Sequence, residues 1–469
     1  MWFDSRHLFL AKRTLKQAIN LVRDPPPRLQ QLVLKEVAFW DGALRYVLKV
    51  RGRTLEHSFI FDQPTTALLR DADLGEMQGL LACLGLLMTP LYFRLGDFAS
   101  VHCEIAGLDD ASTGLFEDVI RNSLGEFRMR VGLDPLRPVK ITSKSESPPE
   151  PAFRRNPSGK AILMNGGGKD TAVSAELLKA LQIRFVWCTY DKNIARTNVA
   201  LASGVEDEIS FTMRRDPSLK EASRYPPSSG HFPVIQILSG VGALLAYLYG
   251  FRYVIFGNEY SADFGNLTHR GMEINHQYGK STAFATAFND IMKRCALRDA
   301  DCFSILRPFY DIAVGRLLAR FPAYHDKFIS CNRDGHNNQW CKRCSKCAWT
   351  FLVLYPFLAE DQVIGIFGEN LFYREIIRRE IWNLAVGSIK PWDCVGTQEE
   401  VRLALALALE RMPEDLSSWP RRADFSKLLE GLDPPLVQLL QPRSDGHCLP
   451  PTIAAAMPAA LDRMLENGR

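Results

Sequence analysis

A run of three glycines, residues 166–168, most constrains what this chain can fold into. Four apolar residues at strand length, 161–164, precede the glycines, and residues 172–181 follow them with amphipathic helical spacing. A strand, a glycine turn and a helix N-terminus in this order direct several backbone N–H groups at one point, where the helix dipole adds about half a positive charge. Lys169 adds a full positive charge. The segment therefore predicts a phosphate or pyrophosphate site.

Two commoner nucleotide motifs do not fit this segment. It has neither the G-x-x-x-x-G-K-[ST] pattern of a Walker A loop nor the G-x-G-x-x-G pattern of a Rossmann dinucleotide site. It resembles instead the S-G-G-x-D-S loop of the ATP pyrophosphatase superfamily, whose members split ATP into AMP and pyrophosphate while activating a substrate as its adenylate. Gly167, Gly168, Asp170 and Thr171 match that pattern, and Gly166 stands where the family usually has Ser. The alternative is a glycine-rich structural turn in an α/β sheet.

Composition narrows the class of protein. The chain has 469 residues, of which 46% are hydrophobic, enough for two or three domains with real cores. A net charge of +4 is too mild to favour nucleic acid as a partner. Residues 1–13 carry charges within their apolar run and no small-residue cleavage site, so we expect no signal peptide and a cytoplasmic location. The apolar stretch 234–249 is short for a membrane span and contains Gln236, Ser239 and Gly240, which favours a buried helix.

The sequence predicts four parts. These are an N-terminal α+β domain at 1–135, a linker rich in Pro, Ser and charge at 136–159, an ATP-binding catalytic domain at 160–355 and a helical region at 356–469. Strand and helix patterns alternate within 160–355, which predicts an α/β fold with a doubly wound parallel sheet. The resemblance adds that this sheet is of the adenine-nucleotide alpha-hydrolase (pyrophosphate-loop) type.

Ligands of such sheets bind beyond the carboxyl ends of the strands. The glycine run and the residues after two further predicted strands should therefore share one crevice. The residues expected to contact ATP are Asn165, Gly166, Gly167, Gly168, Lys169, Asp170, Thr171, Tyr190, Asp191, Gly257, Asn258 and Glu259.

The segment 257–281 gathers carboxylates, amides, imidazoles and aromatic side chains with little apolar periodicity. A solvated surface loop has no need of so many of these groups together. The composition therefore favours a substrate-binding loop, although either of its histidines, His269 or His276, is also compatible with a purely structural hydrogen-bonding role.

Four of the eleven cysteines form the most specific metal signal, Cys331-x9-Cys341-x2-Cys344-x2-Cys347. Four thiolates in one short loop can close a tetrahedral site, and an odd cysteine count in a large chain without a secretory signal indicates a reducing compartment. The spacing is similar to the zinc site of 7-cyano-7-deazaguanine synthases, which also belong to the pyrophosphate-loop superfamily. We expect structural zinc; an iron–sulfur cluster and free buried thiols are the alternatives.

Four motifs together look like the bacterial epimerases of the MurL type: N-G-G-G-K-D-T, G-N-E-x-S-A-D-x-G-N, E-I-N-H-Q-Y-G-K-S and S-C-N…W-C-x-x-C-x-K-C. These enzymes act on UDP-N-acetylmuramoyl-L-alanyl-L-glutamate in peptidoglycan precursor synthesis. The resemblance covers most of residues 160–355. It implies dependence on ATP and Mg²⁺, release of AMP and pyrophosphate, a UDP-linked muramoyl dipeptide as substrate and inversion of the terminal L-Glu to D-Glu.

The implied chemistry assigns roles to particular side chains. The Cα–H beside an ionised carboxylate is a very weak acid, and adenylation removes that negative charge. Asp170 and Lys169 are expected to serve activation, and Glu259 or Asp263 to hold Mg²⁺. A general base must reach Cα within hydrogen-bonding distance, for which His276 and Lys280 are the candidates.

Two other functions are compatible with the same residues. One is an amide- or nitrile-forming ligase similar to 7-cyano-7-deazaguanine synthase, in which ammonia intercepts the adenylate. The other is a nucleotide-sensing protein that keeps the glycine loop but makes no product.

Overall fold

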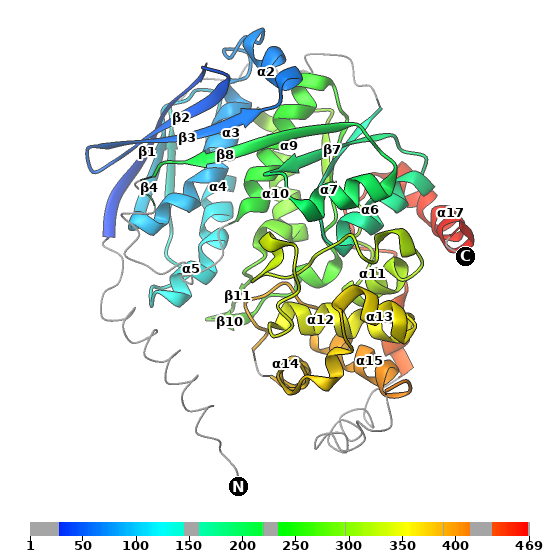
Figure 1. Ribbon diagram of the computed structural model, residues 1–469. Helices are drawn as coiled ribbons and strands as arrows, with labels where there is room; N and C mark the ends of the chain where they lie inside the picture. Colours follow the sequence, from blue (N-terminus) through cyan, green and yellow to red (C-terminus); the bar gives the residue numbers. More distant parts are fainter. Residues whose placement is uncertain are drawn as a thin grey trace.

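The strands of this computed structural model belong to one large sheet and one small hairpin (Figure 1). The structure describes residues 28–144, 159–217, 219, 233–295, 297–387, 389–412 and 434–467. The strands of the large sheet are β1 Arg28–Trp40, β2 Ala43–Val50, β3 Arg53–Phe61, β4 Asp97–Cys103, β5 Lys140–Ser143, β6 Ala161–Met164, β7 Phe185–Tyr190, β8 Glu208–Arg215, β9 Tyr253–Phe256 and β12 Asp301–Ser304. The hairpin consists of β10 Leu267–His269 and β11 Met272–Ile274.

Fourteen α-helices are described: α2 Gln63–Arg70, α3 Gln78–Met88, α4 Asp110–Ser123, α5 Gly125–Arg130, α6 Lys169–Ala180, α7 Ile194–Ser203, α9 Val234–Tyr249, α10 Thr282–Cys295, α11 Asp311–Leu318, α12 Ser345–Leu354, α13 Glu360–Phe367, α14 Glu375–Val386, α15 Gln398–Leu409 and α17 Pro451–Asn467. The fold is therefore mixed α/β, as predicted from the alternating patterns.

The large sheet has ten strands in the order β12-β9-β6-β7-β8-β3-β2-β1-β4-β5. From β12 to β8 all neighbours are parallel, as the sequence predicts for residues 160–355. β8, β3, β2 and β1 are then joined by antiparallel pairs, and β4 and β5 add a second parallel edge. The N-terminal strands thus continue the sheet that carries the glycine run (Figure 1).

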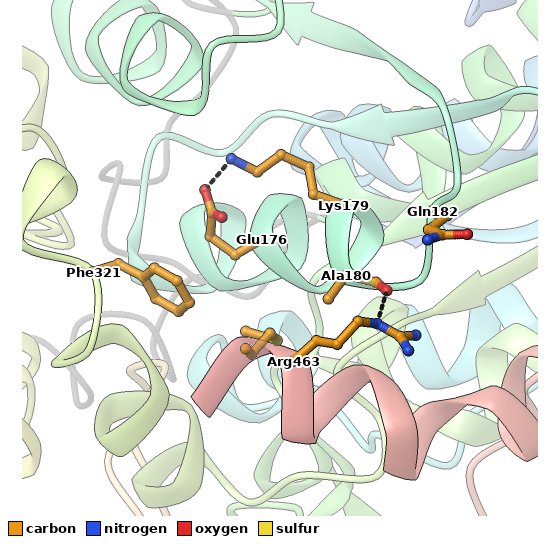
Figure 2. A pocket seen from close by; sticks show the side chains of 7 residues that line it. Glu176, Lys179, Ala180, Gln182, Phe321 and Arg463 are labelled. Carbon is orange, nitrogen blue, oxygen red and sulfur yellow. Dashed lines mark hydrogen bonds and ion pairs between the residues drawn. The ribbon is translucent and has the colours of Figure 1, made fainter. Parts of the chain in front are cut away.

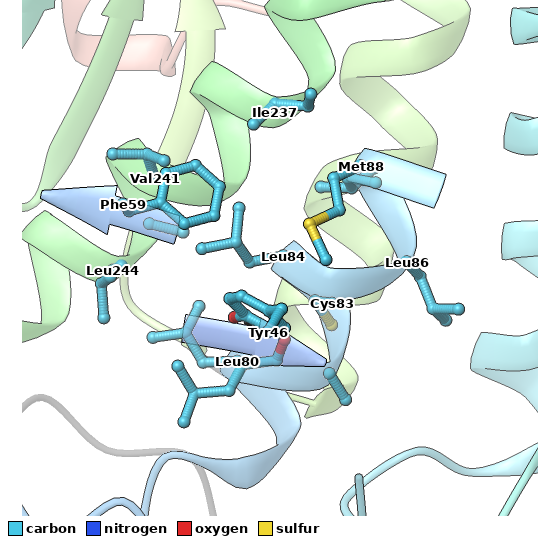
Figure 3. Close-up of a cluster of buried hydrophobic side chains, with 14 of the residues drawn as sticks. Tyr46, Phe59, Leu80, Cys83, Leu84, Leu86, Met88, Ile237, Val241 and Leu244 are labelled. Atoms are coloured by element: carbon cyan, nitrogen blue, oxygen red, sulfur yellow. Dashed lines mark hydrogen bonds between the residues drawn. The ribbon is translucent and has the colours of Figure 1, made fainter. Parts of the chain in front are cut away.

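β6 shows why helices cover both faces of this sheet. All four of its residues are buried, and successive side chains point to opposite faces. Ile162 and Met164 join a core shared with α3 and α9, whereas Ala161 and Leu163 join a core shared with α6, α11 and α12. Figure 3 shows the first core, in which Leu80 and Leu84 of α3 lie close to Val241 and Leu244 of α9.

Several local predictions are confirmed. The turn dipeptide Asp41-Gly42 joins β1 to β2, with both residues at positive φ as a tight hairpin turn requires. Residues 234–249 form the buried helix α9.

The structure describes part of the predicted linker. Its residues 140–143 form β5. Residues 145–158 of the linker lie outside the described residues, as does the segment 1–13.

One apolar stretch, Gln78–Leu95, is long and apolar enough to cross a membrane by composition alone. In the folded chain 83% of it is buried inside the protein, where α3 packs against α9. It therefore has the surroundings of a core helix.

The strand order places the glycine run at the point where the sheet reverses direction. From β6, the chain adds β7 and β8 on one side and then β9 and β12 on the other. In open parallel sheets ligands bind in the crevice beyond the strand ends at such a switch point. The residues that follow β6 and β9 therefore lie where this class of fold binds its ligands.

Candidate functional site

The glycine loop after β6 is held by its own side chains. Gly166 N–H donates to Thr171 Oγ1 at 3.1 Å, and Gly167 N–H donates to Asn165 Oδ1 at 3.0 Å. Gly167 has a φ of +71°, and a Cβ there would lie 2.9 Å from the backbone nitrogen of Arg196. Only glycine fits this position, because both the conformation and the close approach of α7 exclude a side chain.

The helix that follows the loop begins without a side-chain cap. Gly168 is the N-cap residue of α6, and it has no side chain to accept from the first N–H groups. These donors, together with the positive end of the helix dipole, favour an anion at this end of α6. The loop thus offers backbone donors where the sequence predicts a phosphate site, and the phosphate itself stays a prediction.

The ammonium group of Lys169 lies inside the protein. Its side chain is fully buried, and its ammonium forms ion pairs with Asp170 and Asp311. Burial alone lowers the pKa of an ammonium, but the carboxylates of Asp170, Asp311 and Glu259 outweigh it and raise the pKa of Lys169. Asp311 also accepts from the indole N–H of Trp349. Lys169 therefore links the glycine loop to the start of α11.

Glu259 carries a buried carboxylate that lacks a complete set of partners. Its side chain is 3% exposed, and within the described part of the chain Oε2 accepts no hydrogen bond. Burial raises the pKa of Glu259, and the nearby carboxylates of Asp311 and Asp170 raise it further. Oxygen ligands from one or two carboxylates are what Mg²⁺ uses beside phosphates, so Glu259 and the partly exposed Asp170 fit a magnesium ion.

Asp263, the other carboxylate expected at the metal, is already engaged. Its two oxygens accept from the backbone N–H and the hydroxyl of Thr282, the first residue of α10. The guanidinium of Arg307 lies 3.4 Å from Asp263 Oδ1 and donates to the backbone carbonyls of Glu259 and Lys280. Arg307 therefore holds the backbone at both ends of the segment 259–280.

The ends of the two strands beside β6 carry the other residues that are expected to contact ATP. Tyr190 ends β7 and Asp191 follows it, and the Arg196 guanidinium donates to both of their carbonyls. A Cβ on Gly257 would lie 2.6 Å from Ser174 Oγ, so the end of β9 passes directly against α6. Asn258 N–H donates to Ser304 Oγ at 2.6 Å, which ties this end to β12.

His276 and Lys280, the expected bases, both approach Cys394. Lys280 Nζ lies 3.4 Å from Cys394 Sγ, and His276 Nε2 lies 3.9 Å from the same sulfur. The other ring nitrogen of His276, Nδ1, lies 3.0 Å from Asn266 Oδ1. Burial lowers the pKa of Lys280, but Cys394, Glu259 and Asp170 outweigh burial and raise it. Of the two predicted bases, Lys280 therefore lies within electrostatic range of Asp170, which follows the glycine loop.

The four cysteines come together as predicted. One sulfur atom from each of Cys331, Cys341, Cys344 and Cys347 lies within 4.8 Å of all the others. Cys341 Sγ and Cys347 Sγ are 3.7 Å apart, close to the edge of about 3.8 Å of a tetrahedron with Zn–S bonds of ~2.3 Å. Backbone N–H groups donate to Cys331 Sγ and Cys344 Sγ, as they do to thiolate ligands. The donor set fits a structural zinc ion.

This cysteine cluster adjoins the glycine loop. Ile329 N–H donates to the carbonyl of Gly167 at 3.1 Å, and a Cβ on Gly168 would lie 3.1 Å from Ser330 Oγ. The next residue is Cys331. A metal held by the cluster would therefore fix the backbone that supports the glycine loop.

Sequence patterns missed three of the residues around the site. Asp311 of α11 pairs with Lys169, Trp349 of α12 donates to Asp311, and Cys394 lies 114 positions beyond Lys280. None of them belongs to a recognisable local motif. The unusual run Trp392-Asp393-Cys394 is the one local signal, and sequence reasoning alone gives it a packing role.

A cavity of about 380 Å³ lies away from this site, at the C-terminal end of α6 (Figure 2). There Arg463 of α17 donates to the carbonyl of Ala180 at 3.0 Å, and Lys179 pairs with Glu176. The glycine loop lies at the opposite end of the same helix, so this cavity is separate from the candidate site.

Family models describe most of the chain. Residues 36–305 match the model of the MurL N-terminal domain, and residues 327–421 match that of the MurL C-terminal domain. A protein of Xanthomonas oryzae pv. oryzae named UDP-N-acetyl-alpha-D-muramoyl-L-alanyl-L-glutamate epimerase is 28% identical over 82% of this chain and 87% of its own. Proteins with the same name are 31% identical in a Micromonospora species, over 65% of this chain and 69% of its own, and 28% identical in Salinispora tropica, over 70% and 71%.

Proposed function

The chain belongs to the MurL family, and we propose that it is an ATP-dependent epimerase of UDP-N-acetylmuramoyl-L-alanyl-L-glutamate that converts the terminal L-Glu to D-Glu. The names of its relatives support an epimerase of this peptidoglycan precursor. The observation that carries the ATP requirement is the glycine loop at the switch point of the parallel sheet, with the carboxylates of Asp170 and Glu259 beside it.

In this proposal the loop binds the phosphates of ATP. The N–H groups of residues 166–168 and the start of α6 supply the donors, and the strand order supports a fold of the pyrophosphate-loop type. Asp170 and Glu259 hold Mg²⁺, which neutralises charge on the phosphates. Lys169 keeps Asp170 in position by pairing with it and with Asp311.

Activation makes inversion possible at neutral pH. The substrate α-carboxylate attacks the α-phosphorus, pyrophosphate leaves and an acyl adenylate forms. The acyl group no longer carries the negative charge of a carboxylate, so the carbanion at Cα can delocalise into it. A proton leaves Cα, another arrives on the opposite face, and hydrolysis releases AMP and the D-Glu product. In this proposal His276 and Lys280, which both approach Cys394 Sγ, transfer these protons.

The cysteine cluster has a structural role in this proposal. Cys331, Cys341, Cys344 and Cys347 hold zinc, which ties the segment that supports Gly167 to the start of α12. The ion supplies a fixed scaffold and takes no part in the reaction.

The direct test is chiral analysis of glutamate after incubation of the protein with the UDP-linked L-Ala-L-Glu substrate, ATP and Mg²⁺. We expect D-Glu, with AMP and pyrophosphate formed beside it. AMP release that strictly requires ammonia, without inversion, would favour the ligase, and ATP binding without turnover would favour the sensor.

Asp170→Asn is the sharpest variant for this test. It removes the charge proposed to face Mg²⁺ but leaves Lys169 paired with Asp311, so the fold should persist. We expect AMP formation to fall by about 100-fold or more, the scale of losing one electrostatic stabiliser. The exposed Asp462→Asn in α17 is the matched control and should keep full activity. Normal AMP formation by folded Asp170→Asn would contradict the assignment.

A further inference from the structure

Three side chains from distant parts of the chain form a hydrogen-bonded series that no sequence motif indicates. Cys394 Sγ lies 3.9 Å from His276 Nε2, and His276 Nδ1 lies 3.0 Å from Asn266 Oδ1. A thiol, an imidazole that faces it and an amide that orients the imidazole are the arrangement of a cysteine nucleophile with its base.

The neighbours of Asn266 fix its orientation. Its Nδ2 group donates to the carbonyls of Pro391 at 2.8 Å and Lys390 at 3.2 Å, and carbonyls can only accept. Oδ1 must therefore face His276, where it also accepts the backbone N–H of that residue at 2.9 Å. Since Oδ1 is an acceptor, the ring proton of neutral His276 lies on Nδ1. The lone pair of Nε2 then faces the sulfur of Cys394.

A cation stands on another side of the same sulfur. Lys280 Nζ lies 3.4 Å from Cys394 Sγ, so an ammonium group stands beside this sulfur. Cys394 is half-buried, so a ligand can reach it. The backbone that carries Lys280 is held by Arg307, which also holds Glu259.

An incompletely satisfied carboxylate connects this series to the glycine loop. Glu259 is 97% buried, and its Oε2 accepts no hydrogen bond from the described residues. The charges of both Glu259 and Asp170 act on Lys280. An acyl adenylate that reaches from the loop to Lys280 would come close to Cys394, because Lys280 Nζ lies 3.4 Å from Cys394 Sγ.

From this geometry we propose that Cys394 is a nucleophile that takes the acyl group from the adenylate and carries it as a thioester during inversion, with His276 as its base and Asn266 as a positioning residue. This inference rests on the proposed function, because it needs an activated acyl group. Here the proton exchange at Cα takes place in an enzyme-bound thioester, whereas in the mechanism above it takes place in the acyl adenylate.

The steps balance without a further reactant. His276 Nε2 takes the thiol proton, the sulfur attacks the acyl carbon, and the bond from that carbon to the AMP oxygen breaks so that AMP leaves with the electron pair. The Cα–H of a thioester is more acidic than that of a carboxylate, so a proton leaves Cα and another returns on the other face. Water then attacks the carbonyl, the C–S bond breaks and the sulfur regains a proton. The sum consumes ATP and water and gives AMP, pyrophosphate and the epimer.

Intact-protein mass spectrometry after acid quench of the wild-type reaction tests the thioester directly. We expect a species heavier by the substrate minus one water, which hydroxylamine returns to the original mass. Cys394→Ala should lack this species and lose inversion by about 1,000-fold or more, while Cys394→Ser should not restore turnover. Cys448→Ala, at an exposed cysteine that is not part of the series, is the matched control and should retain both.

Alkylation by iodoacetamide tests the reactivity of Cys394 without ATP or substrate. Peptide mapping should show Cys394 reacting about tenfold or more faster than Cys448 at neutral pH, and His276→Ala should reduce that ratio. For Asn266, the conservative Asn266→Gln should retain more of the ratio than Asn266→Ala, since only a residue that orients the imidazole is rescued in this way.

The two readouts separate this inference from the function on which it rests. If the wild type inverts glutamate and forms AMP, yet Cys394→Ala inverts at the wild-type rate, the nucleophile is excluded and the epimerase stands. If the wild type forms no AMP with the UDP-linked dipeptide, the proposed function fails, and equal alkylation of Cys394 and Cys448 would then overturn the inference as well.

Discussion

At the scale of single residues, Lys169 belongs to the predicted phosphate-binding motif, yet its ammonium forms buried ion pairs within the protein. The pattern around the glycines predicts a lysine at a phosphate site, and it contains nothing about Asp311, which lies 142 positions away. The ion pair between them is fully buried, and removing one partner of such a pair leaves the other charge in a medium that cannot solvate it.

Lys169→Met should therefore destabilise the protein by about 3–5 kcal/mol, because Asp311 is left without its cation. The measurement is the free energy of unfolding in urea. The double variant Lys169→Met/Asp311→Asn should recover part of the loss, since it removes the uncompensated charge. Equal stability of wild type and Lys169→Met would contradict the role of this pair.

The role of Cys394 also depends on residues that are distant in the sequence. Its neighbours in the sequence carry no recognised pattern, and the residues that give it a chemical meaning are His276, Lys280 and Asn266. The sequence marks the first two as candidates within a dense polar segment, but their common neighbour depends on how the loop after α14 folds back. Contacts of this kind arise from tertiary structure and leave no local periodicity.

At the scale of elements, the features that were predictable are those whose cause is local. The glycine loop, α6 and the cysteine spacing all follow from residues within one short window, and the structure contains each of them. Zinc and iron–sulfur clusters share thiolate ligands, so the cysteine spacing predicts a metal site and elemental analysis identifies the metal.

Protein purified without added metal should contain about one zinc ion per chain by elemental analysis, as expected for a closed site of four thiolates. Iron with inorganic sulfide in place of zinc would overturn this assignment in favour of a cluster. Absence of any metal would favour free thiols.

Cys344→Ser should lower the melting temperature and the zinc content together, because the metal ties the segment that supports Gly167 to α12. Cys448→Ser is the control for loss of a thiol as such, since Cys448 is exposed and outside the cluster. A Cys344→Ser protein with full zinc and unchanged melting would show that Cys344 is not a ligand.

At the scale of the whole molecule, the sheet crosses the boundary that the sequence predicts at residue 159. β3 pairs with β8 from His57–Arg215 to Phe61–Phe211, and α3 packs on α9. Strand patterns predict that β1, β2 and β3 exist, but the edge to which they attach depends on pairing partners some 150 positions away. The sequence therefore predicted the parallel half of the sheet well and could not predict its junction with the N-terminal strands.

Because of this junction, we expect the two halves of the sheet to unfold cooperatively. Buried residues of β1–β4 and α3 share one core with β6, β9 and α9, so the two halves should unfold in a single calorimetric transition. Gly240 of α9 tests the contact, because a Cβ there would lie 2.9 Å from Leu84 Cδ1 and 3.2 Å from Leu84 Cα. Gly240→Ala should lower the stability by about 1–3 kcal/mol, since the helices must move apart.

Gly114→Ala is the matched control for that substitution. Gly114 also lies inside a helix, α4, and a Cβ there meets nothing within 4 Å. The change should therefore stabilise the protein by about 0.5–1 kcal/mol, through helix propensity alone. If the two halves fold as one unit, Gly240→Ala shifts the whole transition to lower temperature without splitting it. Two separate transitions, with only one of them displaced, would mean that the N-terminal strands and the sheet of the glycine loop are stable independently.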